Sequence, residues 1–407
     1  MGKNELPASI TEISGGITVA AGFKADGIKA GIKQTGKPDL ALLFSEKPCT
    51  GAGTFTKNAI RASSVDWCEE ILPSKEIHAI ICNSGCANAC TGDRGRMDTE
   101  LMAKLTGDTL GVKKEAVLVA STGVIGKPLP MDKIQSALPE LSKVLSSEGG
   151  TNFSTAIMTT DTKEKQSAVR IETSQGVFFM GGTAKGSGMI HPNMATMLAF
   201  ICTDASIEPE LLDRTVKQTV NRTFNNLTVD GDTSTNDMVL VLANGASPVT
   251  ISSESDLLLF EKALYTVCND LCKQIAADGE GATKRVEINV TGARNETDAK
   301  LAAKAVANSN LTKCALFGND PNWGRIACAV GYSGAQFSKE KMTIHLCKVP
   351  VFKNMQPELF DESSLHNALK SKVVTIDIDL GLGSFSAVAH TCDFSYDYVK
   401  INAEYRT

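Results

Sequence analysis

Short apolar runs alternate with longer amphipathic stretches along the first half of the chain. An uninterrupted apolar run is typical of a buried strand, whereas apolar positions that recur every three or four residues predict a helix. The pattern predicts strands at residues 40–44, 79–82 and 116–120 and helices at residues 61–72, 98–110 and 131–145. The first half is therefore expected to mix α and β structure.

The same alternation continues through the second half. It predicts strands at residues 197–202, 238–242, 286–290, 373–378 and 386–390, and helices at residues 209–220 and 257–277. We expect each half to need the other to cover its strands. The predicted fold class is α/β or α+β, with sheets packed against each other and helices outside.

Domain boundaries are weakly marked. No short-period repeat, low-complexity tract or proline-rich linker divides the chain. The glycine and serine content of residues 146–152, SSEGGTN, makes this segment the best local linker. Residues 292–297, GARNET, form a weaker one.

Composition and charge narrow the class of protein. The chain has 407 residues and a formal net charge of -5, so no basic surplus is available to neutralise a phosphate backbone, and we expect no nucleic-acid partner. The first residues carry acids and a proline rather than a signal peptide, and Leu6 does not fit a myristoylation site at Gly2. No apolar run approaches the ~18 residues of a membrane span. Twelve cysteines without a secretion signal predict reduced thiols and a cytoplasmic location.

One cysteine cluster needs separate treatment. Cys82, Cys86 and Cys90 are separated by three-residue gaps, which would place the three thiols on one face of a helix. The spacing matches neither a paired CxxC zinc site nor a usual iron-sulfur site. A thiol-rich metal-binding protein therefore remains an alternative, but no metal is expected.

The segment of residues 185–200, KGSGMIHPNMATMLAF, carries the main chemical candidate, Thr196. A threonine hydroxyl needs a base beside it, and the residue's own α-amine can serve once the Ala195–Thr196 bond is broken. A free α-amine has a pKa of about 7.7–8.0, so a base needs that pKa lowered by burial or by a cation such as Lys185. The alternative is a glycine turn that leads into a buried strand, with Thr196 as an ordinary β-branched residue.

The string around Thr196 closely resembles the cleavage segment of the ornithine acetyltransferase family. Further blocks extend the resemblance over the chain in one order: GFKADGIKAGIK at residues 22–33, NSGCANACTG at 83–92, STGVIG at 121–126, MTTDT at 158–162, TVDGDTSTND at 228–237, DGEGATK at 278–284, GNDPNWGRI at 318–326 and INAEYRT at 401–407. The first cysteine of the second block, Cys86, departs from the family pattern, where asparagine is usual.

The resemblance implies a function in arginine biosynthesis. Enzymes of this family move acetyl from N2-acetyl-L-ornithine to L-glutamate by a ping-pong mechanism through an acetylated threonine, here Thr196, and some members also acetylate glutamate with acetyl-CoA. No metal or organic cofactor is implied. Cleavage between Ala195 and Thr196 would give an α chain of residues 1–195 and a β chain of residues 196–407. The family fold is a four-layer αββα sandwich, and its chains assemble as an α2β2 heterotetramer.

The oxyanion hole is expected in the block STGVIG. Attack on an acyl carbonyl builds an oxyanion that needs preorganised donors. The resemblance assigns this role to the Thr122 hydroxyl and the Gly123 backbone N–H. Without the family, a β-turn with a capping threonine explains the same residues equally well.

The resemblance also implies a set of substrate-binding residues: Thr159, Lys185, Thr196, Glu280, Asn402 and Thr407. Thr160 remains an alternative to Thr159, because the two are adjacent in MTTDT. An acid such as Glu280 can hold the amino group of ornithine or glutamate, and an ammonium such as Lys185 can meet a carboxylate. Without the family, the sequence favours a surface lysine in a glycine loop at Lys185, and a solvated turn glutamate is the alternative at Glu280.

Two further motifs and one histidine have limited roles. DGEGATK lacks the ending of a phosphate-binding loop. Asp230 and Asp232 begin like a calcium loop, but Thr235 stands where such a loop needs glycine, so turn formation and hydrogen bonding near the site are expected instead. His191 is expected to be structural, with assistance to cleavage as the alternative.

A self-processing hydrolase is the main competing function. In that reading water, rather than glutamate, resolves the acyl-enzyme, and composition does not distinguish the two outcomes. Loss of acetylornithine that depends on glutamate and releases no free acetate would separate transfer from hydrolysis.

Overall fold

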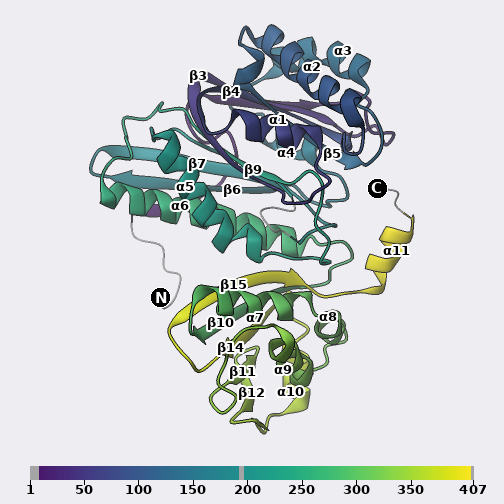
Figure 1. Cartoon of the computed structure of the whole chain (residues 1–407), viewed down its shortest axis with the longest axis vertical. Coiled ribbons are helices and arrows are strands. Elements are labelled where there is room, and N and C mark those ends of the chain that lie inside the picture. Colours follow the sequence, from purple (N-terminus) through teal and green to yellow (C-terminus); the bar gives the residue numbers. More distant parts are fainter. Residues whose placement is uncertain (1–8, 192–196, 405–407) are drawn as a thin grey trace.

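The computed structural model describes residues 9–191 and 197–404. Figure 1 shows a larger unit that holds the first strands and helices and a smaller unit formed by the later part of the chain. Among the described residues no helix is long and apolar enough to cross a membrane. The positions predicted at Ala195, Thr196 and Thr407 lie outside the described residues.

The larger unit is built on one nine-stranded sheet, counted over the described residues. Its strands are β1 (Ile10–Ile13), β2 (Phe23–Ile28), β3 (Leu40–Phe55), β4 (Ser74–Cys86), β5 (Val117–Val124), β6 (Lys165–Thr173), β7 (Gly176–Lys185), β8 (Leu198–Thr203) and β9 (Met238–Ala243). They lie in the order β1-β6-β7-β8-β9-β3-β4-β5, and β2 also pairs with β3.

Strand β3 folds this sheet into two layers. Its first part pairs with β2 and β4, whereas residues Thr50–Phe55 pair with β9. Register shifts between Phe44 and Gly51 interrupt its pairing with β4. Irregularities of this kind bend a strand, so β3 passes from the β2-β4-β5 layer to the β6-β7-β8-β9 layer.

Alternating side chains fill the spaces on both sides of each layer. In β8, Phe200 joins the core between the two layers, while its neighbour Ile201 faces the core beneath the helices α5 and α6. In β5, Leu118 joins the central core, while Val119 packs with residues of α2 and α3. The period-2 alternation thus places a β layer on each side of one core and helices on the two outer faces. The predicted α/β fold with an αββα sandwich is confirmed.

In the described part of the larger unit the helices are α1 (Ser63–Ile71), α2 (Gly92–Leu110), α3 (Met131–Val144), α4 (Gly150–Ile157), α5 (Pro209–Arg222) and α6 (Glu254–Ala277). Short 3-10 turns occur at Lys114–Ala116 and Phe224–Asn226. The predicted linker at residues 146–152 is wrong, because Ser146 pairs with Ala25 and the segment runs into α4. Its glycines serve close packing, since a Cβ at Gly149 would lie 1.8 Å from the Ala25 carbonyl oxygen.

The smaller unit has its own core and its own sheet, which has six strands within the ranges that the structure describes. Its strands are β10 (Arg285–Ala293), β11 (Thr343–Leu346), β12 (Val349–Lys353), β13 (Gln356–Pro357), β14 (Val373–Asp379) and β15 (Phe385–Cys392), and its helices are α7 (Glu296–Asn308), α8 (Asn310–Phe317), α9 (Trp323–Tyr332) and α10 (Glu362–Ala368). The weaker predicted linker, residues 292–297, is also wrong, because it joins β10 to α7 inside this unit.

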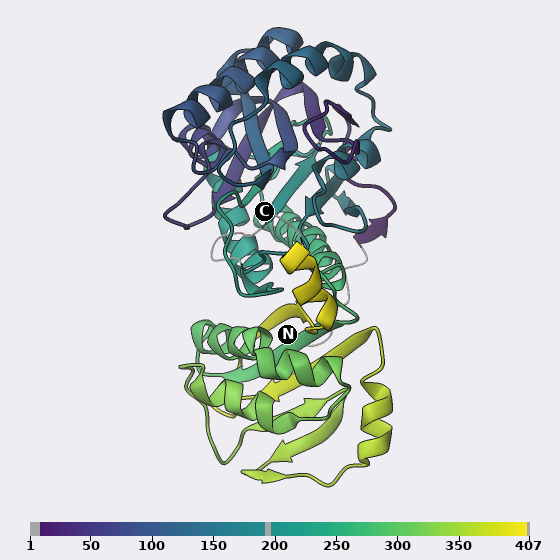
Figure 2. The same cartoon turned by 90° about the vertical axis from the view of Figure 1, so that its right-hand side faces the viewer.

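Helix α11 (Tyr396–Glu404) follows β15 and leaves the smaller unit. Figure 2 shows it standing between the two units. It buries none of its residues, but Asn402 Nδ2 donates a hydrogen bond of 2.8 Å to Glu280 Oε2. This contact brings the end of the described chain to the edge of the larger unit.

Candidate active site

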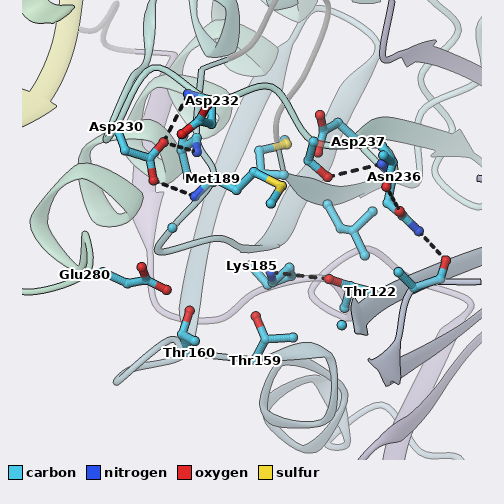
Figure 3. Close-up of a pocket in the computed structure, with 18 of the residues that line it drawn as sticks. Thr122, Thr159, Thr160, Lys185, Met189, Asp230, Asp232, Asn236, Asp237 and Glu280 are labelled. Atoms are coloured by element: carbon cyan, nitrogen blue, oxygen red, sulfur yellow. Dashed lines mark hydrogen bonds between the residues drawn. The ribbon is translucent and has the colours of Figure 1, made fainter. Parts of the chain in front are cut away.

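A single pocket collects the candidate residues that the structure describes. Its lining includes Thr122, Gly123, Thr159, Thr160, Lys185, Glu280 and Asn402, which come from distant parts of the sequence. Met197, the residue after Thr196, also lines it. Figure 3 shows Lys185 between Thr122 and the side of the pocket that holds Glu280. The predicted grouping of these residues is thus present, while Ala195, Thr196 and Thr407 lie outside the described residues.

Thr122 and Gly123 lie inside strand β5, so the β-turn explanation of STGVIG is wrong. Gly123 has a φ of +129°, and a Cβ there would lie 2.4 Å from the backbone carbon of Gly85. Only glycine fits at this close approach of β5 to the irregular end of β4. The backbone shape that exposes this pair to the pocket is therefore encoded by two glycines that face each other.

Lys185 ends strand β7 and is 8% exposed. Its Nζ donates to Thr122 Oγ1 at 3.4 Å. Because the lysine donates to the hydroxyl oxygen, the hydroxyl hydrogen of Thr122 is left to donate elsewhere. Thr122 can thus offer an O–H to an oxyanion with a positive charge directly behind it.

A buried ion network joins three of the sequence blocks behind the pocket. Lys165 Nζ lies 2.7 Å from both Asp161 Oδ1 and Asp278 Oδ2. Asp161 also accepts backbone hydrogen bonds from Thr159, at 3.0 Å, and Gly186, at 2.7 Å. Burial raises the pKa of Asp161, but the charges of Lys165 and Lys185 outweigh it and hold that pKa well below its usual range. Sequence reasoning missed Lys165, which stands outside the MTTDT block.

The choice between Thr159 and Thr160 stays open, because both residues line the pocket. In Figure 3 Thr159 lies nearer Lys185 and Thr160 nearer Glu280. Both threonines are therefore placed to contact a ligand in the pocket.

Glu280 is held in place from both sides. Its backbone N–H donates to the Ser187 carbonyl at 2.9 Å, and its carboxylate accepts from Asn402. A Cβ at Gly188 would lie 2.3 Å from the Glu280 carboxyl carbon, so the glycine makes room for this carboxylate. Among the described lining residues Lys185 is the only lysine or arginine. A cation near one side and a carboxylate on the other suit a ligand that carries both charges, such as an amino acid.

The DGDTSTND loop forms a further wall of the pocket. Asp230 accepts backbone hydrogen bonds from Met189, at 2.6 Å, and Ile190, at 2.8 Å, which confirms the predicted hydrogen-bonding role of this loop. Burial raises the pKa of Asp230. Burial and the nearby charges of Asp230, Glu280 and Asp232 also raise the pKa of Tyr398 on α11. Together these groups make this wall acidic.

Asn236 and Asp237 were not predicted as site residues, yet both line the pocket. They are 4% and 2% exposed, and Asp237 Oδ2 has no hydrogen-bond partner among the described residues. Burial raises the pKa of Asp237 well above its usual range. A run of polar residues directly before an apolar strand was the signal that could have identified them.

His191 does not line the pocket. Its Nδ1 lies 3.2 Å from Thr228 Oγ1, and its carbonyl accepts from Thr233 Oγ1 at 2.9 Å. Burial lowers its pKa to about 4, which keeps the imidazole neutral. These contacts favour the structural role expected for this residue.

The three clustered cysteines do not share a helical face, because Cys82 and Cys86 belong to strand β4. The irregular end of β4 turns them to opposite sides: Cys82 joins the core between the layers and Cys86 the core beneath α2 and α3. Cys90 is exposed. The described residues hold no group of three or more histidine, cysteine or acidic side chains suited to a metal ion.

Comparisons with known proteins agree over nearly the full chain. The model of the ArgJ family matches residues 24–407. The arginine biosynthesis bifunctional protein ArgJ of Symbiobacterium thermophilum is 47% identical over 97% of this chain and 99% of the relative. The protein of the same name from Caldanaerobacter subterraneus is 49% identical, again over 97% and 99%. A solved structure, ornithine acetyltransferase complexed with ornithine from Mycobacterium tuberculosis, is 39% identical, covers 46% of this chain and 100% of that chain, and has a TM-score of 0.44.

Proposed function

Because this chain belongs to the ArgJ family, we propose that it transfers acetyl from N2-acetyl-L-ornithine to L-glutamate through an acetyl ester on Thr196. The membership confirms the family predicted from the sequence, and with it an acetyltransferase enzyme of arginine biosynthesis. One observation carries the more detailed proposal. Residues predicted to stabilise the oxyanion and to bind substrate converge on one pocket beside Met197, which directly follows Thr196.

The first step in the proposal is self-cleavage. The Thr196 hydroxyl attacks the Ala195 carbonyl, and the acyl group shifts from nitrogen to oxygen, which frees the α-amine of Thr196. Water then hydrolyses the resulting ester and releases the Thr196 hydroxyl and the Ala195 carboxylate. The two products are an α chain of residues 1–195 and a β chain of residues 196–407. Strands β7 and β8 flank the cut and pair from Lys185↔Leu198 to Met180↔Thr203. This ladder and the shared core support continued association of the two chains.

Acetyl transfer follows at the same hydroxyl. Thr196 attacks the acetyl carbonyl of N2-acetylornithine, and its own α-amine takes the hydroxyl proton as the base. The α-amine then passes this proton to the departing nitrogen, and ornithine leaves. Glutamate then attacks the acetyl ester and regenerates the Thr196 hydroxyl. In both steps the Thr122 hydroxyl and the Gly123 N–H donate to the oxyanion, and Lys185 keeps the Thr122 hydroxyl oriented.

Substrate recognition in the proposal divides between two charges. Glu280 receives an ammonium group, and Lys185 and the hydroxyl of Thr159 receive a carboxylate, while Asn402 holds Glu280 in place and Thr407 completes the site. The relatives are named bifunctional. We therefore include acetyl-CoA as a second acetyl donor to glutamate. An α2β2 assembly and a cytoplasmic location remain predictions from the sequence, which size-exclusion chromatography and cell fractionation test.

Intact-mass measurement of freshly purified protein tests the first step. The wild type should give two fragments that meet at Ala195/Thr196, and Thr196→Ala should give one full-length chain. A folded wild type that remains uncut would remove the mechanism that uses the α-amine of Thr196. An assay with N2-acetylornithine then tests the second step: its loss should require glutamate and release no acetate. Acetate release without glutamate would make the protein a hydrolase.

A further inference from the structure

We infer that Asn236 is a positioning residue, whose side-chain amide holds the Thr122–Gly123 pair at a fixed place relative to strand β8. The inference rests on the proposed function, because it concerns the geometry between the oxyanion donors and the strand that follows Thr196. It extends the site to a residue that sequence reasoning did not identify.

The amide bridges two backbone segments beside the oxyanion donors. Asn236 Nδ2 donates to the Ser121 carbonyl at 2.8 Å and to the Ala87 carbonyl at 2.6 Å. Ser121 directly precedes Thr122 in β5, and Ala87 follows the irregular end of β4 against which Gly123 packs. One side chain thus holds both backbone segments that shape the donor pair.

The orientation of this amide is fixed by chemistry. Two carbonyl oxygens can only accept hydrogen bonds, so the amide nitrogen must face them. On its other side the Thr235 hydroxyl donates to Asn236 Oδ1 at 2.5 Å. All these groups are buried or nearly so, where an unmade hydrogen bond is costly. The amide therefore has one satisfied arrangement.

The bridge crosses between the two β layers. Asn236 lies two residues before Met238, whose backbone N–H donates to the Met197 carbonyl at 3.0 Å. Strands β5 and β9 are separated in the sheet order by β3 and β4. Without the amide, the position of Thr122 relative to β8 depends on those intervening ladders and on core packing. With it, the two layers are joined at the pocket itself.

A positioning role makes a specific kinetic prediction. Removal of the amide leaves Thr122, Gly123, Lys185 and Glu280 in the chain, so substrate binding persists while the donors lose their alignment. A displacement of about 1 Å can lower a rate about a hundredfold. The loss should therefore appear in kcat and leave KM nearly unchanged.

The chain supplies a matched control at the other end of β9. Asn244 is 5% exposed, and its Nδ2 donates to the Ala21 carbonyl at 2.8 Å. It likewise joins β9 to a separate backbone segment, yet it does not line the pocket. Asn236→Ala and Asn244→Ala remove similar bonds, so they separate an effect on the site from an effect on the fold.

The test measures glutamate-dependent acetyl transfer per cleaved chain, with cleavage followed by intact mass. We expect Asn236→Ala to lower kcat by about 10- to 100-fold with KM within about threefold, and Asn244→Ala to leave both within about threefold. In Thr122→Ala, addition of Asn236→Ala should lower kcat by a smaller factor than it does in the wild-type background, because part of its effect acts through the Thr122 hydroxyl, and effects through one group are not additive.

Three outcomes would overturn the inference: equal kcat losses for Asn236→Ala and Asn244→Ala, a rise in KM with kcat unchanged, or full additivity with Thr122→Ala. If Asn236→Ala does not fold or cleave, Thr235→Val carries the test. It removes only the hydroxyl that orients the amide, and it should lower kcat several-fold at unchanged KM. Wild-type protein that transfers no acetyl would instead reject the proposed function.

Discussion

The two ends of strand β9 are bordered by similar residues, an asparagine and a buried aspartate, that are used differently. At the Ala243 end, Asp204 directly follows Thr203 of β8, which pairs with Ala243. Asp204 accepts hydrogen bonds from the backbone of Phe179, at 2.7 Å, and Ala21, at 3.1 Å, and Asn244 donates back to the Ala21 carbonyl. Before Met238, Asp237 keeps an oxygen without a hydrogen-bond partner among the described residues, and the pocket lies beside it.

The contrast separates polar groups that hold the fold from polar groups left for chemistry. Buried polar atoms in folded proteins are almost always paired, so an unpaired one at a pocket wall needs an explanation. At the Asp204 end the polar groups satisfy one another and tie three chain segments together. At the Asp237 end pairing is incomplete, which favours a site that a ligand completes. Substitutions should therefore change stability at one end and activity at the other.

The largest effect is expected for Lys185→Met. This variant removes the cation that contacts Thr122, and loss of an electrostatic contribution at an oxyanion lowers kcat by about 10²–10³-fold. Initial rates of acetyl transfer measure the loss, and a melting temperature near that of the wild type shows that the fold is retained. Activity within tenfold of the wild type would place the chemistry elsewhere.

A smaller effect on binding is expected for Glu280→Gln. Hydrogen bonds to charged groups contribute about 1.5–3 kcal/mol, so KM for acetylornithine should rise about 10- to 100-fold with a lesser change in kcat. The matched control is Glu208→Gln, an exposed acid whose ion pair with Lys75 lies on the surface. Its KM should equal that of the wild type. An unchanged KM in Glu280→Gln would remove Glu280 from the binding site.

The two aspartates test the comparison directly through stability. Asp204→Ala removes the acceptor of the Phe179 and Ala21 backbone N–H groups, so the free energy of unfolding should fall by about 1.5–3 kcal/mol while kcat stays near wild type. Asp237→Ala should lower the free energy of unfolding by less than about 1 kcal/mol, because an incompletely paired buried carboxyl contributes little. Denaturant unfolding measures both, and equal losses would contradict the contrast.

The smallest effect concerns pH. Burial raises the pKa of Asp237 above its usual 3.8, so above pH 4 the folded state binds a proton that the unfolded state has lost. The contribution of Asp237 to stability is therefore present below pH 4 and falls as pH rises toward its folded pKa. Asp237→Asn should remove this fall, and the difference in unfolding free energy between variant and wild type should grow in favour of the variant from pH 4 to pH 7. A constant difference would contradict the raised pKa.

The predictable part of the fold was the part with strong apolar periodicity. The buried strands at residues 40–44 and 79–82 and the helix at residues 257–277 recur in the structure with extended bounds, and the strand predicted at residues 197–202 recurs one residue later, at Leu198–Thr203. The predicted strand stopped at Phe44, because the exposed residues Glu46–Pro48 interrupt the apolar run, whereas β3 continues through this bend to Phe55. The pattern of apolar residues over a few positions therefore does not reveal that a strand continues through such a bend.

Elements that bury small or few side chains escaped prediction. Helix α7 packs through alanines such as Ala299, Ala303 and Ala307, whose weak hydrophobicity gives little periodic contrast. Helix α11 buries no residue and so has no apolar stripe to detect. The site followed the same division. Lys185 and Glu280 could be named from their sequence blocks. Lys165 stands outside the blocks, and Asn236, although inside TVDGDTSTND, is distinguished only by its contacts across the fold.

Helix α11 links the docking of the C-terminal segment to ligand binding in the pocket. It is anchored by Asn402 on Glu280 and by Tyr396, whose ring meets that of Phe317 edge to face at 5.5 Å. Docking of this helix and binding at Glu280 therefore share a contact, and two equilibria that share a contact are thermodynamically linked. A ligand that binds the docked state shifts the helix toward it in proportion to occupancy. Amide hydrogen exchange along residues 396–404 should slow as the pocket fills. The exchange rate of this helix therefore reports the fraction of protein that has substrate bound.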